Sequence, residues 1–99
     1  MNFKKVDKIF SKWAQSSGLH VQIEYKGEEV RSTDMLDSNN KKWQLWLVPV
    51  DSEDQCVIHY WNYKDISRQT KVSNSKLQQE LTNIERSIKT GEIKQSYLP

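Results

Sequence analysis

Residues 43–63, WQLWLVPVDSEDQCVIHYWNY, decide the fold of this 99-residue chain. They hold three of the four tryptophans and two of the four tyrosines. Two runs rich in β-branched and aromatic residues flank the polar stretch DSEDQ, which is the pattern of a β-hairpin. We therefore expect this hairpin to form the centre of a sheet, with the flanking helices covering it.

The register of the hairpin decides which side chains share a face of the sheet. We considered the register in which Val50 lies opposite Cys56. One face then holds Trp43, Leu45, Leu47, Val57, His59, Trp61 and Tyr63, and the other holds Trp46, Val48, Val50, Cys56, Ile58 and Tyr60. A shift of one residue recombines the sets, but both faces stay apolar. Either the helices divide between the faces, or one aromatic face is left uncovered.

Apolar residues at helical spacing predict a helix at each end of the chain. The first covers residues 2–17, and Gly18 follows it at the position of a left-handed C-terminal cap. The second begins near residue 73, with Ser75 and Gln78 at the spacing of a capping box, and ends at Gly91.

Two strands are expected between the first helix and the hairpin. Residues 19–25 alternate apolar and polar side chains, and residues 28–35 form a weaker, charged segment typical of a sheet edge. Residues 64–72 are polar and fit either a loop or a strand extension. The sequence therefore predicts a single α+β domain over residues 1–99. It has two layers, with a four-stranded, mainly antiparallel sheet and an N-terminal and a C-terminal helix (α-β-β-β-β-α).

Charge and cysteine content limit the class of protein. Fifteen basic and thirteen acidic residues give a net charge of +2, too small a surplus to indicate a polyanion-binding protein. The single cysteine, Cys56, forms no internal disulfide, which favours a reducing compartment. The N-terminal residues lack the apolar core of a signal peptide, and no apolar run approaches the length of a transmembrane helix. We expect a cytoplasmic protein.

The sequence carries no pattern that indicates an enzyme. Cys56 and His59 are three apart on a predicted strand, so they lie on opposite faces and share neither a metal ion nor a proton. The three glycines stand in unrelated contexts and form no phosphate-binding loop. We expect no catalytic residues, no cofactor and no metal.

One short stretch resembles a known family. Residues 10–19, FSKWAQSSGL, followed by a predicted strand, resemble the start of double-stranded-RNA-binding domains, which share the order helix, strands, helix. Those domains open their final helix with a basic cluster that grips phosphates. The corresponding residues 73–81 here are SNSKLQQEL, with Lys76 alone, and the sheet is expected to hold one strand more. We therefore assign no family on this resemblance.

The aromatic surplus of the hairpin predicts a surface for another macromolecule, because exposed apolar patches mark partner sites and tryptophan, tyrosine and arginine dominate interface energetics. We expect a protein-binding module that neutralises or regulates one partner, such as a toxin or host enzyme. Immunity proteins, antitoxins and phage-type inhibitors form this class. The module would bind through an aromatic sheet face or an open sheet edge, and self-association is a further possibility. The partner-binding residues are expected to be Trp46, His59, Trp61, Tyr63 and Arg68.

The alternative function is binding of single-stranded nucleic acid, mainly RNA. Sheet aromatics would then stack on bases while basic side chains hold the backbone. The basic residues in question are Lys41, Lys42, Lys64, Arg68 and Lys71.

Overall fold

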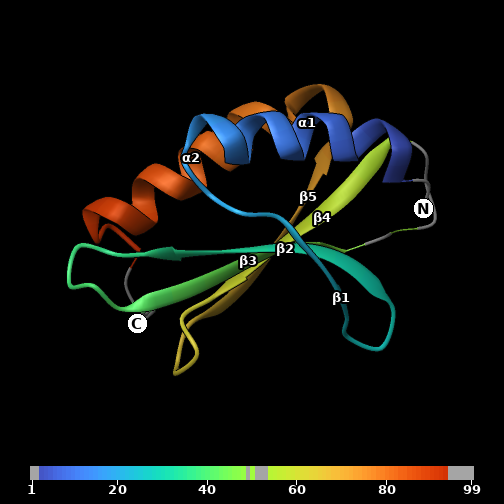
Figure 1. Ribbon diagram of the computed structural model, residues 1–99. Helices are drawn as coiled ribbons and strands as arrows, with labels where there is room; N and C mark the ends of the chain where they lie inside the picture. The colour runs from blue at the N-terminus through green and yellow to red at the C-terminus, as the bar shows by residue number, and fades with distance from the viewer. Residues whose placement is uncertain (1–2, 49, 51–53, 94–99) are drawn as a thin grey trace, which may run out of the picture.

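The computed structural model describes residues 3–48, 50 and 54–93, and the structural statements below refer to them. The elements in chain order are α1 (Phe3–Ser16), β1 (Gln22–Tyr25), β2 (Glu29–Leu36), β3 (Lys42–Val48), β4 (Gln55–Trp61), β5 (Ser67–Ser73), the 3-10 turn η1 (Asn74–Lys76) and α2 (Leu77–Thr90). The strands form one antiparallel sheet in the order β1-β2-β3-β4-β5. Both helices lie on the same side of it (Figure 1).

The α+β class and the antiparallel sheet with two helices are confirmed, but the sheet has five strands rather than four. The additional strand is β5, within the stretch for which the sequence left loop or strand open. Its residues pair with β4 over the whole length from Ser67 opposite Trp61 to Ser73 opposite Gln55. Backbone pairing with a strong neighbour therefore makes this polar segment a strand, although only Val72 is buried in it.

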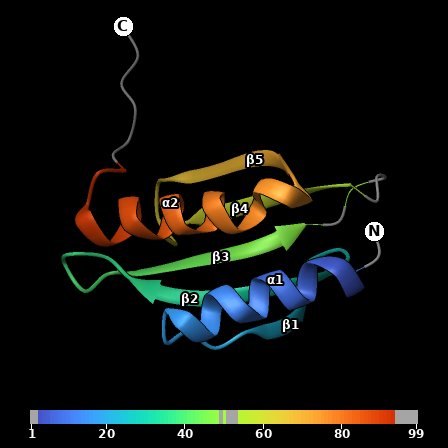
Figure 2. The same cartoon turned by 90° about the horizontal axis from the view of Figure 1, so that it is seen from above.

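The helices do not divide between the two faces of the sheet. In the view from above, α1 and α2 lie side by side over the strands (Figure 2), and their apolar stripes enter one hydrophobic core. The sheet contributes one face to that core. The buried core residues of the sheet are Met35, Trp43, Leu45, Leu47, Cys56, Ile58 and Val72.

The hairpin register differs by one residue from the one we considered. Val48 lies opposite Val57 and Trp46 lies opposite His59, so Cys56 and Ile58 join Leu45 and its neighbours instead of facing away from them. Apolar side chains lie on both faces of the hairpin, since Trp46 and Trp61 occupy the face away from the helices, but Gln44 and His59 lie on that face as well. Residues 51–53 of the hairpin loop lie outside the described residues.

The C-terminal ends of both helices agree with the sequence. Gly18 and Gly91 have φ of 70° and 75°, the left-handed conformation expected of caps. A methyl group on Gly91 would also come within 2.9 Å of Ser38 Oγ. The capping box is wrong: α2 begins at Leu77, after η1, and no side chain caps either element.

A partly buried carboxylate joins the two helices. Glu85 of α2 accepts hydrogen bonds from Trp13 Nε1 at 3.0 Å and Ser17 Oγ at 2.8 Å. Lys89 lies 2.6 Å from its other oxygen. Burial opposes ionisation, but these donors outweigh it and lower the pKa of Glu85.

None of the described helices has the length and apolar character needed to cross a membrane.

Candidate functional site: the open face of the sheet

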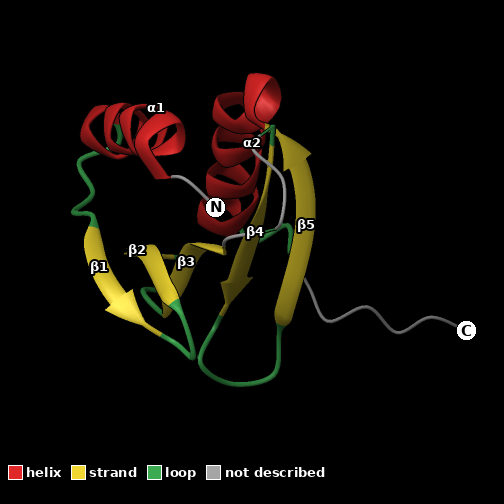
Figure 3. Cartoon of the chain, turned by 90° about the vertical axis from the view of Figure 1, so that its right-hand side faces the viewer, coloured by secondary structure: helices red, strands yellow, loops and turns green. Residues whose placement is uncertain are grey.

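The face of the sheet opposite the two helices is the candidate site, and we call it the open face (Figure 3). Strand alternation and the pairing register place its residues. They are Gln22, Glu24, Val30, Ser32, Asp34, Leu36, Lys42, Gln44, Trp46, Val48, Gln55, Val57, His59, Trp61, Ser67, Gln69, Lys71 and Ser73. Val30, Ser32, Gln44 and Trp46 are buried, whereas the β4 and β5 residues are half-buried or exposed.

Aromatic rings form a continuous row along the open face. The rings of Trp46 and His59 are 3.9 Å apart, and those of Trp46 and Trp61 meet edge to face at 6.4 Å. The ring of Tyr63, in the loop after β4, lies 4.6 Å from that of Trp61. Such contacts fix ring orientations, because tilted and edge-to-face arrangements match the charge distribution of aromatic rings.

Trp46 is the buried base of this row. Only 8% of it is exposed, because the ring of His59 covers it and Lys26 Nζ sits 5.1 Å from its centroid. His59 is held in turn by Ser67, whose Oγ is 2.7 Å from Nε2. Burial, and then the charge of Lys26, lower the pKa of His59. The imidazole is therefore neutral at pH 7 and suited to stacking.

Polar groups of β1, β2 and β3 form a network beside the rings. Glu24 Oε2 accepts hydrogen bonds from Ser32 Oγ at 2.8 Å and Gln44 Nε2 at 3.1 Å, and Lys26 Nζ is 3.9 Å away. At the next row, Lys42 Nζ is 3.7 Å from Asp34. Each of these two carboxylates therefore lies beside one lysine, and the described centre of the face is nearly neutral.

The structure brings together four of the five expected partner-binding residues. Trp46, His59, Trp61 and Tyr63 are neighbours in the aromatic row. Arg68 is separated from them, because it lies opposite Tyr60 on the face that carries the helices. Within the four, Trp46 is covered, so the surface offered to a partner comes from the other three.

The five basic residues of the alternative function do not form one stripe. Lys42 and Lys71 lie on the open face, but at opposite ends of it, and Lys42 is paired with Asp34. Arg68 lies on the other face, while Lys41 and Lys64 are exposed in the loops before β3 and after β4. The positive charge is therefore dispersed around the rings.

Cys56 and His59 lie on opposite faces of β4, as the sequence predicted. Cys56 is buried in the core and His59 is on the open face, and burial raises the pKa of the Cys56 thiol to about 11. Among the described residues, no group of three or more His, Cys, Asp or Glu side chains could hold a metal ion.

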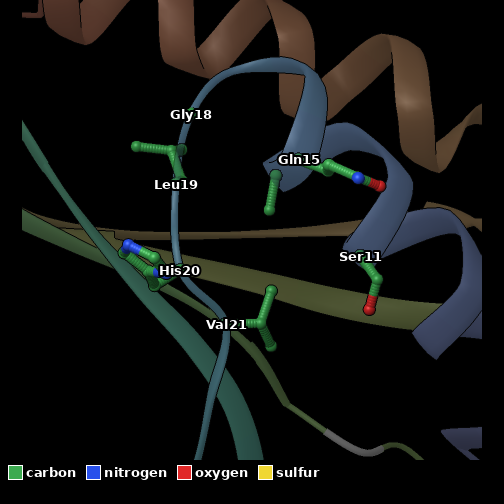
Figure 4. A pocket seen from close by; sticks show the side chains of 7 residues that line it. Ser11, Gln15, Gly18, Leu19, His20 and Val21 are labelled. Atoms are coloured by element: carbon green, nitrogen blue, oxygen red, sulfur yellow. The ribbon is translucent and has the colours of Figure 1, made fainter.

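A separate cleft of about 430 Å³ lies between α1 and the segment that leads to β1 (Figure 4). Ser11 and Gln15 line it from the helix and Leu19, His20 and Val21 from the segment. His20 points away from Ser11 and Gln15, so the polar groups do not converge. Convergent polar groups distinguish ligand sites from surface hollows, and the open face is therefore the better candidate.

Sequence reasoning missed Glu24, Lys26 and Gln44 as parts of the site. Glu24 and Lys26 come from β1 and the turn after it, two strands away from the rings they adjoin, and only the meander topology brings them there. Gln44 carried a signal: it is the one polar residue within the run WQLWLV. A polar residue inside a buried strand marks a hydrogen-bonded site more often than a packing position.

No protein-family model, curated protein or solved structure matches this chain.

Proposed function

We propose that this chain is a non-enzymatic protein-binding module that docks one partner protein through the open face. The observation that carries the proposal is the group of His59, Trp61 and Tyr63 on the sheet face opposite both described helices. Rings of this kind supply most of the energy of protein interfaces when a partner removes them from water. The buried ring of Trp46 holds them rigid beforehand, which lowers the entropic cost of binding.

The charge arrangement favours a partner whose contact surface is largely uncharged. The lysines and carboxylates of β1, β2 and β3 and the turn after β1 lie beside one another, so their charges largely cancel. A partner surface therefore needs no net charge to match them. Interface centres are typically depleted in charge, with polar groups at the rim. Gln69 and Lys71 are exposed on β5, at the edge of the sheet, and form such a rim.

Three features favour a protein over single-stranded nucleic acid. The basic side chains are dispersed, Lys42 is paired with a carboxylate, and the rings of Trp61 and Tyr63 stack on each other. Salt dependence separates the two ligands. Single-strand binding weakens with a slope of about −0.7 in log affinity per phosphate contact. Measurable oligonucleotide binding with a steep slope would contradict the proposal.

The open face is a better docking surface than the sheet edges. The edge strand β1 has four residues, and the other edge strand, β5, carries Arg68 and Lys71. Short length and charge are the means by which proteins discourage pairing at an edge. Self-association through the open face is tested by light scattering, and we expect a monomer in the absence of the partner.

The finer role that we propose is neutralisation or regulation of the partner, the class of immunity proteins, antitoxins and phage-type inhibitors. Its support is a small domain with a rigid face that is suited to occlude one surface of another protein. An effect on the partner's activity, measured with purified components, tests this role separately from binding.

The binding proposal is tested by quantitative capture from an extract of the native host. Trp61→Ala should reduce capture at least tenfold, since interface aromatic residues of this kind contribute about 2 kcal/mol or more. Its matched control is Tyr25→Ala, which removes a 78% exposed ring from the other face and should leave capture unchanged.

A second pair of variants adds bulk and charge without removing a ring. Gln69→Arg on the open face should reduce capture of the same protein, whereas Gln79→Arg on the exposed side of α2 should not. Urea unfolding confirms that each variant is folded. If both open-face variants capture as much as the wild type, or if the control variants lose capture equally, the open face is not the docking surface.

A further inference from the structure

Tyr63 lies across one row of the open face. Asp34, Gln44 and Trp61 are cross-strand partners on β2, β3 and β4, so they form a single row. The ring of Tyr63 stacks on Trp61 with centroids 4.6 Å apart, and its hydroxyl donates to Asp34 Oδ1 at 3.0 Å. Because the side chain contacts both outer members of the row, it overlies Gln44 in the middle.

The position of Tyr63 is unusual for an aromatic residue. Its φ is 63°, in the left-handed region that bulky side chains rarely occupy. The loop around it does not depend on the ring, because Asn62 Oδ1 accepts hydrogen bonds from the backbone N–H groups of Lys64, Asp65 and Ile66. Tyr63 is 43% exposed, so rotation about its side-chain bonds moves the ring into solvent while the loop keeps its shape.

Two buried polar atoms in this row have no hydrogen-bond partner. They are Gln44 Oε1, an acceptor, and Trp61 Nε1, a donor. Gln44 is only 4% exposed, and its Nε2 is already used by Glu24. Directly opposed side chains on neighbouring strands have Cβ atoms about 4.5–5.5 Å apart. The row therefore holds an unpaired acceptor and an unpaired donor on directly opposed side chains, and buried groups left unpaired in this way are rare.

The geometry points to a site for a primary carboxamide, the side-chain group of asparagine or glutamine, which a partner protein inserts when Tyr63 swings aside. This inference rests on the proposed function and names the group by which the partner is recognised. The carboxamide NH₂ would donate to Gln44 Oε1, and its carbonyl would accept from Trp61 Nε1.

Three other common protein groups fit this donor–acceptor pair less well. A trans peptide group carries its N–H and C=O on opposite edges, so it cannot serve both atoms at once. A carboxylate accepts but does not donate, and Glu24 and Asp34 would repel it. An ammonium donates but does not accept. A primary carboxamide has one N–H and the C=O on the same edge.

The site is tested on the full chain by NMR, with the indole N–H signal of Trp61 as the reporter. The probes are propionamide, N-methylpropionamide and N,N-dimethylpropionamide, which share a carbonyl group. Only propionamide carries an N–H on the carbonyl edge. In Tyr63→Ala, propionamide should shift the Trp61 signal saturably, with half-saturation about tenfold below that of the other amides, the contribution of one hydrogen bond.

The variants separate the effect of Tyr63, which covers the site, from the effect of the residues that form the site. Wild-type protein should need more propionamide than Tyr63→Ala, because the closed form competes with binding. Tyr63→Phe lacks the hydrogen bond to Asp34, so its propionamide concentration at half-saturation should lie between those of the wild type and Tyr63→Ala. It also replaces the alanine variant in the test if that variant fails to fold. Adding Gln44→Met, which keeps the volume and removes the acceptor, to Tyr63→Ala should abolish saturation.

Three results would overturn the inference. The first is a Trp61 signal that all three amides shift alike. The second is a Trp61 signal that none of the amides shifts, which would mean that Trp61 and Gln44 hydrogen-bond each other. The third is uridine saturating below propionamide, which would assign the pair to a nucleobase edge. If the amides fail while the open face still captures its partner, only this inference falls and the proposed function stands.

Discussion

Trp46→Ala should destabilise the protein strongly, although Trp46 lies on the face that both helices leave uncovered. Its 8% exposure places it in the class of buried aromatic residues, whose replacement by alanine costs about 3–5 kcal/mol. That cost includes the contact with His59 and the position of Lys26 over the ring. For a domain of this size, the loss corresponds to a fall in Tm of about 15–30 °C. It is a large part of a typical total stability of about 5–15 kcal/mol.

The assay is equilibrium urea unfolding followed by circular dichroism, with wild type, Trp46→Ala, Trp46→Phe and Tyr25→Ala in parallel. Trp46→Phe keeps a ring against His59 and should lose less than the alanine variant. Tyr25→Ala is the control for an exposed ring and should change the free energy of unfolding by about 0.5 kcal/mol or less. A loss below about 1 kcal/mol for Trp46→Ala would refute the burial of this ring and the support it gives to the open face.

Two further predictions concern ionisable groups. His59 has a pKa lowered by burial and by Lys26, so the unfolded chain binds the proton first. Stability should be complete above pH 6.5 and should fall as the pH drops from there towards the folded-state pKa. His59→Gln should flatten this decline in urea unfolding at successive pH values, and an identical decline in the variant would assign it to another group. Glu85→Ala should cost roughly 1–3 kcal/mol, because it leaves the buried indole N–H of Trp13 without its acceptor. Glu85→Gln keeps an acceptor oxygen and should cost less in the same unfolding assay, whereas equal losses would count against the role of that bond.

The architecture was predictable where one local pattern was strong. The apolar stripe of Val6, Phe10 and Trp13 placed α1, and the aromatic runs placed the hairpin. The polar strand β5 was not predictable in the same way, because its conformation comes from pairing with β4 along its length. Pairing is a non-local property, and β propensity mostly reports packing against neighbours.

The observed register follows from the sequence if the polar residues of the hairpin are required to share one face. In the register that we considered, Gln44 and His59 fall on different faces, so each face carries a polar residue. In the structure both lie on the open face, and the helix-covered face of β3 and β4 is apolar apart from the hydroxyl of Tyr60. Segregating the polar residues lets one face form a dry core, because a buried polar group needs a partner there.

The details of the candidate site were beyond sequence reasoning for a different reason. The contact between Gln44 and Glu24 spans three strands, and the position of Tyr63 depends on a left-handed backbone conformation in a loop. Neither follows from periodicity or composition. The sequence predicted that the hairpin aromatics form a partner surface, which stays a prediction, but which ring is covered and which is exposed depends on side-chain packing.

The four tryptophans provide the most direct test of docking through the open face, because each gives one indole N–H signal in an NMR spectrum. Trp13 and Trp43 belong to the core beneath the helices, and Trp46 and Trp61 belong to the open face. On titration with the purified partner, the Trp61 signal should shift most and those of Trp13 and Trp43 should stay in place. A shift of Trp13 or Trp43 with Trp61 unmoved would place the partner on the helices and contradict docking through the open face.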